Sequence, residues 1–115
     1  MGQHTFLAFD LGATSGRCYA GTLENGKLHM QELTRFPNAP VHKNSHYYWD
    51  MPSLLANLGN GFSASVAANL APTSVGIDTW GVDFGLLNKA GDLVDLPYAY
   101  RDPHTNGMPE KFFEL

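Results

Sequence analysis

The sequence contains little cysteine, little basic charge and no long apolar run. Its single cysteine, Cys18, cannot form an internal disulfide, and with no export signal at the N-terminus this predicts a reducing, cytoplasmic location. Seven Lys and Arg against eleven Asp and Glu give a net charge of -4, which argues against a nucleic-acid partner. No apolar stretch approaches the roughly 20 residues that span a bilayer, so no membrane partner is expected. The five histidines show no metal-ligand spacing.

The composition, with 43% hydrophobic residues in 115, is that of one ordinary globular unit. The pattern of apolar residues is α/β, with mixed strand directions. The Asn25-Gly26 pair predicts a tight turn, so the first three strands should form an antiparallel meander. The end of the chain, MPEKFFEL, predicts the first turns of a helix, and we expect residues 1–115 to be part of a longer domain. Strands are expected at 5–11, 18–23, 28–36, 74–79 and 83–88.

A helix is expected to begin near Asp50, which can cap it, and to end before Pro72. Gly59 and Gly61 weaken this helix by about 1 kcal/mol each relative to alanine, and would let a neighbouring backbone come close. Residues 37–49 are expected to form a loop, and the strands at 5–11 and 74–79 to be buried. The apolar stripe expected to face the core is Leu55, Leu58, Phe62, Val66 and Leu70.

The stretch AFDLGATSGRC joins the first two predicted strands and places small, hydroxylated residues between Asp10 and Arg17. Its glycines let backbone N–H groups approach an anion, and the hydroxyls of Thr14 and Ser15 add donors. Arg17 can pair with a phosphate or close the turn. Because a carboxylate beside a phosphate needs a cation between them, Asp10 predicts Mg²⁺. The loop is neither a GxxxxGK[ST] nor a GxGxxG motif, and an ordinary glycine-rich turn is the alternative.

Two later clusters also carry polar chemistry. In GIDTWGVDFG the period of a strand puts Asp78 and Trp80 on one face, and an aromatic face beside acids is typical of sugar sites. The alternative is a structural strand with a core tryptophan. In YAYRDPHTNG, Arg101 could reach a substrate oxygen or pair with Asp102, while His104 is expected at the surface.

Taken in order, AFDLGATSGR, RFPN, YYWDMPSL, SVGIDTWGVDFGLL and LPYAYRDPHTNGM resemble the N-terminal part of the FGGY family of carbohydrate kinases, in the actin–hexokinase superfamily. The motifs match best the members that phosphorylate the ketose L-rhamnulose to L-rhamnulose 1-phosphate. The resemblance implies a ribonuclease-H-like α/β core with a mixed sheet that opens on a three-stranded antiparallel meander. It also implies ATP and Mg²⁺ as cofactors and a ketose as the substrate.

The resemblance further implies roles for individual residues. Asp10 would help hold Mg²⁺, and Gly81 would approach the sugar through its backbone. The other substrate-binding residues would be Trp80, Asp83 and Arg101. The residues contacting the ATP phosphates would be Ala13, Thr14, Ser15, Gly16 and Arg17.

Members of this family are several times longer, and their general base, an aspartate, lies downstream of the last residue here. We therefore expect no catalytic base in these 115 residues and no activity of the chain alone. The alternatives are a kinase of the same family acting on another ketose or on autoinducer-2, and a non-catalytic anion-binding domain. Uncovered strand edges and apolar faces are expected to make the chain self-associate.

Overall fold

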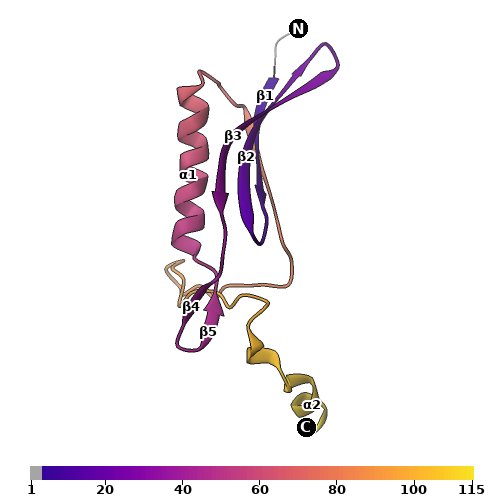
Figure 1. The fold of residues 1–115 in the computed structure, drawn as a ribbon, viewed down its shortest axis with the longest axis vertical. Coiled ribbons are helices and arrows are strands. Elements are labelled where there is room, and N and C mark those ends of the chain that lie inside the picture. The colour runs from indigo at the N-terminus through magenta and orange to yellow at the C-terminus, as the bar shows by residue number, and fades with distance from the viewer. Residues whose placement is uncertain (1–3) are drawn as a thin grey trace. The chain divides into compact units, whose positions relative to one another are not determined.

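Strands β1 (His4–Leu11), β2 (Ser15–Glu24) and β3 (Lys27–Pro37) form the antiparallel meander that the sequence predicts (Figure 1). The computed structural model describes residues 4–115. Asn25 and Gly26 close the second turn with positive φ values of 52° and 73°, as the Asn-Gly pair predicts. Strand β6 (Ser74–Thr79) runs parallel to β1 and gives the order β3-β2-β1-β6, so the sheet is mixed.

Helix α1 (Met51–Ala67) covers one face of this sheet (Figure 1). The apolar stripe predicted for this helix is wrong, because Leu55 and Val66 are 60% and 71% exposed. The buried positions are instead Leu54, Gly61 and Ser65. A small residue faces the sheet because a Cβ at Gly61 would lie 2.5 Å from the ring of Phe9 and 3.0 Å from the Cys18 sulfur. The predicted close approach of a backbone at the two helix glycines is not found, because side chains of Phe9 and Cys18 approach Gly61 and no atom lies within 4 Å of an added Cβ at Gly59.

The two helix glycines should respond to alanine in opposite directions. Gly61→Ala is expected to destabilise the protein by about 1–3 kcal/mol, because its Cβ has to displace Phe9. Gly59→Ala is the matched control, since no atom lies within 4 Å of its added Cβ and alanine favours the helix by up to about 1 kcal/mol. Urea unfolding of both variants measures the difference. Equal effects would show that the helix does not pack on the sheet through Gly61.

Burial of the strands differs from the prediction in two places. Along β1 only Leu7, Phe9 and Leu11 are buried, so one face of the strand meets α1 and the other, which carries Asp10, is partly open. All six residues of β6 are exposed, because this strand lies at the edge of the sheet. A continuous apolar run predicts a strand that is buried in a complete sheet. It does not predict whether the elements that bury the strand lie within this chain.

The region predicted to be a loop contains a hairpin of β4 (Val41–Lys43) and β5 (His46–Tyr48). Its turn residues, Asn44 and Ser45, both have positive φ, and only the first is a residue that favours this conformation. The strand predicted at 83–88 is also wrong, because this segment makes only an isolated bridge between Leu87 and Leu93. Residues 89–91 form a turn, with Gly91 at φ 89°.

The chain forms two compact units, where its composition predicts one. The first, up to Ala39 and then Pro52–Gly81, holds the four-stranded sheet and nearly all of α1. The second, Pro40–Met51 and Val82–Leu115, holds the β4–β5 hairpin, the short 3₁₀ helix η1 (Pro103–Thr105) and α2 (Met108–Phe113). Helix α2 confirms the helical end predicted from MPEKFFEL. Neither α-helix in residues 4–115 combines the length and apolar character of a membrane span.

Candidate functional site

The loop between β1 and β2 turns its carbonyl groups toward the protein. The Ser15 carbonyl accepts from the Gly12 N–H at 2.9 Å. Asn38, only 6% exposed, binds the loop twice: its side-chain amide donates to the Gly12 carbonyl at 2.8 Å and its N–H to the Thr14 carbonyl at 2.9 Å. Asn38 therefore holds the loop in one conformation.

The donors of the same loop have no protein partner. Among residues 4–115, the N–H groups of Ala13 and Thr14 find no acceptor, and neither do the hydroxyls of Thr14 and Ser15. A Cβ on Gly12 would lie 2.8 Å from the Ser15 carbonyl oxygen, so this turn requires glycine. Carbonyls turned inward and donors left over are the arrangement that binds an anion.

Gly16 lies in β2, as do Ser15 and Arg17, so the loop is shorter than the sequence predicts. Gly16 is buried, and a Cβ there would overlap the ring of Phe36. The absence of a side chain at Gly16 thus serves packing across the β2–β3 pair, whatever its backbone contacts. Of these two glycines, only Gly12 is required by the turn itself, because its Cβ would meet a backbone atom of the turn.

Asp10 and Arg17 face each other across the β1–β2 pair. The Arg17 guanidinium donates to the Asp10 carboxylate at 2.6 Å, and the side chains are 35% and 46% exposed respectively. On the other side of β1, Asp78 of β6 is in register with Asp10. Of the two roles predicted for Arg17, the structure shows the one that pairs within the protein and closes the turn.

A divalent cation fits the Asp10 end of this loop. No three His, Cys, Asp or Glu side chains gather into a metal cluster in the part of the chain that the structure describes. Mg²⁺ in phosphate sites does not need one, because one or two carboxylates, waters and phosphate oxygens complete its coordination. Asp10 is a half-exposed carboxylate beside a loop whose N–H and hydroxyl groups can bind a phosphate. A carboxylate together with phosphate oxygens is the ligand set that such a site uses.

The loop clamp can be tested by removing its side chain. Asn38→Ala is expected to cost about 1–2 kcal/mol, because the partly buried Gly12 carbonyl loses its donor. Asn57→Ala is the control: this side chain also donates to a backbone carbonyl, that of Ser53 at 2.9 Å, but on the exposed side of a helix. Urea unfolding and amide exchange at Ala13 report the change. If both variants are equally stable, Asn38 does not hold the loop.

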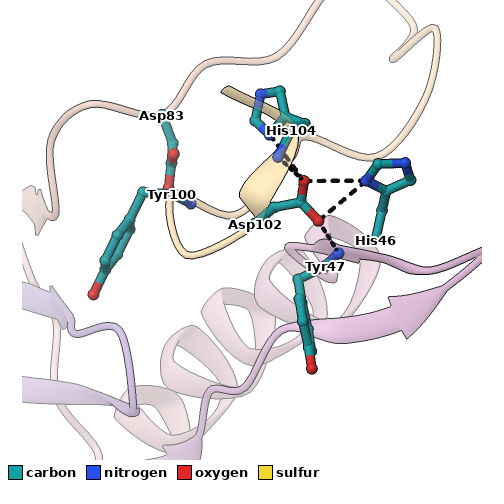
Figure 2. A network of polar contacts seen from close by, with 6 residues as sticks. All are labelled: His46, Tyr47, Asp83, Tyr100, Asp102 and His104. Carbon is teal, nitrogen blue, oxygen red and sulfur yellow. Dashed lines mark hydrogen bonds and ion pairs between the residues drawn. The ribbon is translucent and has the colours of Figure 1, made fainter. Parts of the chain in front are cut away.

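In the second unit, Asp102 is a buried carboxylate, 3% exposed, surrounded by donors (Figure 2). It accepts from the Tyr47 N–H at 2.6 Å and the His104 N–H at 2.9 Å. The Nδ1 atoms of His46 and His104 lie 3.1 and 3.0 Å from its Oδ1. Because a carboxylate only accepts, both Nδ1 atoms carry a proton. Asp102 thereby joins the β4–β5 hairpin to η1.

Burial alone would raise the pKa of Asp102. The backbone hydrogen bond from Tyr47, the side-chain bond from His46 and the two bonds from His104 outweigh it and hold the pKa of this carboxyl well below its usual range. The predicted alternative of an Arg101–Asp102 pair is not formed. Instead the Arg101 guanidinium lies 5.4 Å from the ring centroid of Tyr100. His104 lies at the surface, as expected, and its ring also contacts Asp102.

Asp83 also organises the second unit. Its carboxylate accepts from the indole N–H of the buried Trp49 at 2.6 Å and from the Tyr100 N–H at 3.3 Å. It also lines a cavity of about 680 Å³ together with Tyr98 and His104. The rings of Tyr98 and His104 are stacked, with their centroids 4.2 Å apart. Asp83 is the one predicted substrate residue in this lining.

The remaining predicted substrate residues lie elsewhere. Arg101 is exposed and does not line the cavity, while Trp80 and Gly81 belong to the first unit. Gly81 is exposed, with no atom within 4 Å of an added Cβ. The next residue, Val82, has a positive φ of 67°, which is unusual for a β-branched side chain.

Three residues of these networks have no role predicted from the sequence: Asn38, His46 and Trp49. Asn38 and Trp49 lie in RFPN and YYWDMPSL, two stretches that carry the family resemblance, and these motifs could have indicated that both residues have a role. Their partners are 26 and 34 residues away along the chain, and local patterns do not reveal such pairs. His46 lies in a segment expected to be a loop, and no sequence pattern there predicts its contact with Asp102.

Comparison with known proteins identifies close relatives. No protein-family model matches the chain. It is 48% identical to the rhamnulokinase of Bacteroides thetaiotaomicron over 111 residues, 96% of this chain and 23% of the relative. It is 41% identical to the rhamnulokinase of Oceanobacillus iheyensis over 111 residues, again 96% of this chain and 24% of the relative. The chain thus spans about a quarter of the length of the curated relatives it matches.

Solved structures show the same fold at low identity. A carbohydrate kinase from Novosphingobium aromaticivorans matches 99% of this chain and 23% of its own, with a TM-score of 0.77 and 18% identity. The xylulose kinase from Rhodospirillum rubrum matches 99% of this chain and 24% of its own, with a TM-score of 0.68 and 15% identity. The predicted α/β fold with a mixed sheet and an opening antiparallel meander is confirmed. The chain is therefore similar to rhamnulokinases over nearly all of its own length, shares the fold of carbohydrate kinases, and corresponds to about a quarter of the length of these relatives.

Proposed function

We propose that the complete protein containing this chain transfers the γ-phosphate of ATP to L-rhamnulose and forms L-rhamnulose 1-phosphate. The observation that carries this proposal is the 48% identity to a rhamnulokinase over 96% of the chain. A cytoplasmic place in rhamnose catabolism is part of the same proposal. The chain is taken as part of the N-terminal kinase domain.

The loop supports the nucleotide side of the proposal. The unpartnered N–H groups of Ala13 and Thr14, with the hydroxyls of Thr14 and Ser15, would donate to phosphate oxygens, and Gly16 and Arg17 would complete the contact. Asp10 would hold Mg²⁺, which supplies charge neutralisation between the carboxylate and the phosphates when bound. Asn38 would keep the donors aimed at one place, because its two hydrogen bonds fix the loop carbonyls.

The sugar side rests on the resemblance and on chemistry. Gly81 would present its backbone to the sugar, since it carries no side chain and is exposed. Trp80 would offer an aromatic face, and Arg101 a charged donor. Asp83 would act mainly by shape, because its carboxylate already accepts from Trp49.

The proposal places the general base outside this chain. Asp102 is a poor candidate for that role, because it is buried and its oxygens are engaged by several donors. Asp78 is exposed at the sheet edge, beside Asp10, where a phosphate-side role suits it better. The 115 residues alone are therefore proposed to be inactive.

Substrate profiling tests the proposal. The complete protein is assayed for ADP formation from MgATP with L-rhamnulose, a panel of other ketoses and autoinducer-2, and the product is examined by ³¹P NMR. We expect L-rhamnulose to be preferred and the 115-residue chain to give no turnover. Preference for another substrate would favour a different kinase of the family. Triphosphate binding without any turnover would favour a non-catalytic anion-binding domain.

We also propose that the isolated chain self-associates through β6. This strand has one sheet partner, β1, and exposes Val75 and Ile77 at 49% and 57%. Exposed strand edges recruit further strands. Light scattering after size-exclusion chromatography should show a mass that grows with concentration, and a Val75→Lys variant should reduce it. A constant monomer mass would contradict this.

A further inference from the structure

We infer that Arg17 is the internal counter-ion of Asp10 and has to leave that carboxylate when a magnesium–nucleotide complex binds, so that metal and nucleotide enter together. The inference rests on the proposed function, because it concerns the same loop. It assigns Arg17 two successive partners where the family resemblance implies only the phosphate. What carries it is the contact between two charged side chains at the mouth of the loop.

The pair engages one of the two Asp10 carboxylate oxygens at which a cation would bind. The Nη2 atom of Arg17 lies 2.6 Å from Oδ2 of Asp10, and the two residues face each other on neighbouring strands. A Mg²⁺ ion sits about 2.1 Å from a carboxylate oxygen and demands near-ideal octahedral geometry. A guanidinium at this distance both blocks part of that geometry and repels the ion. Metal binding and the Arg17 contact are therefore competing uses of Asp10.

Arg17 has unused donors for its second partner. Its Nε atom is buried and has no hydrogen-bond partner among residues 4–115. Its guanidinium lies 6.0 Å from the ring centroid of Tyr19, too distant for a strong hold. A short rotation would let the guanidinium donate to a phosphate oxygen held by the loop, which is a favourable charge-assisted contact.

Because of this exchange, the metal ion and the triphosphate each bind weakly alone and bind tightly together. A metal ion without nucleotide meets a carboxylate that Arg17 already neutralises. A triphosphate without metal meets Asp10, a like charge, unless Arg17 abandons its pair. When both arrive, Asp10 gains the metal and Arg17 gains a phosphate oxygen, and no charge is left without a partner.

The test uses the complete protein with two separate probes. Mn²⁺ alone is titrated by water-proton relaxation, and metal-free inorganic triphosphate by calorimetry. Arg17→Met is expected to bind Mn²⁺ roughly two- to fivefold more tightly and triphosphate about tenfold more weakly. Lys27→Met is the control, because it removes a positive charge at the start of β3, at the end of the sheet away from the loop. The control should change neither affinity.

Asp10→Asn provides a second arm that does not depend on the fold of the first variant. Removing the carboxylate charge frees Arg17, so metal-free triphosphate should bind several-fold more tightly. Unchanged or weaker Mn²⁺ binding by Arg17→Met, or unchanged triphosphate binding by Asp10→Asn, would overturn the inference. If Arg17→Met binds Mn²⁺ more tightly and triphosphate more weakly, as expected, but the complete protein phosphorylates no sugar, the proposed kinase activity fails while the counter-ion role stands.

Discussion

Asp10→Asn in the complete protein is expected to lower kcat for ATP-dependent sugar phosphorylation by about 10²- to 10³-fold. Asp10 is the carboxylate at the end of β1 beside a loop of unpartnered donors, and its loss removes the proposed anchor of Mg²⁺. The amide keeps the size of the side chain, so folding should be preserved. Steady-state kinetics with MgATP and L-rhamnulose measure the effect.

Glu32→Gln is the matched control for that variant. Glu32 also accepts from an arginine, Arg35, across two bonds of 2.8 Å, but on the exposed edge strand β3. Its neutralisation should leave kcat within about twofold, since exposed pairs contribute little. A similar loss of activity in both variants would mean that general charge on this sheet, and not Asp10, matters for the reaction.

The second unit is expected to lose stability in acid through Asp102. Its hydrogen bonds hold the pKa of this carboxyl below the ordinary value of 3.8 in the folded state. A depressed folded pKa adds stability that is fully present above the unfolded pKa and is lost as pH falls toward the folded one. The free energy of unfolding should therefore decline steeply below about pH 4.

Asp102→Asn tests this directly. The amide should remove the Asp102 share of the acid-induced decline and leave the unit less stable at neutral pH, because its NH₂ group confronts the N–H donors of Tyr47 and His104. Fluorescence of the buried Trp49 in a Trp80→Phe background follows this unit alone. Asp92→Asn, at an exposed turn, is the control. An unchanged pH dependence in Asp102→Asn would contradict the role of the network.

The prediction succeeded where local chemistry decides the structure. The Asn25-Gly26 turn, the meander and the helical end at α2 all follow from short-range preferences of neighbouring residues. It failed for the β4–β5 hairpin, whose turn has Ser45 at positive φ, and for 83–88, whose apolar pattern forms no strand. Both segments make hydrogen bonds to distant residues that no local pattern contains: Tyr47 donates to Asp102, and Asp83 accepts from Trp49.

The sequence by itself determined the resemblance to carbohydrate kinases, the direction of the first strands and the composition of the loop from Asp10 to Arg17, because these depend on residue types at fixed spacing. The tertiary structure alone decided which face of α1 is buried, since the Phe9 ring leaves room only for Gly61. It also decided that Arg17 pairs with Asp10 and that Asn38 holds the loop. Such contacts join residues far apart along the chain, and only the folded backbone sets the distances between them.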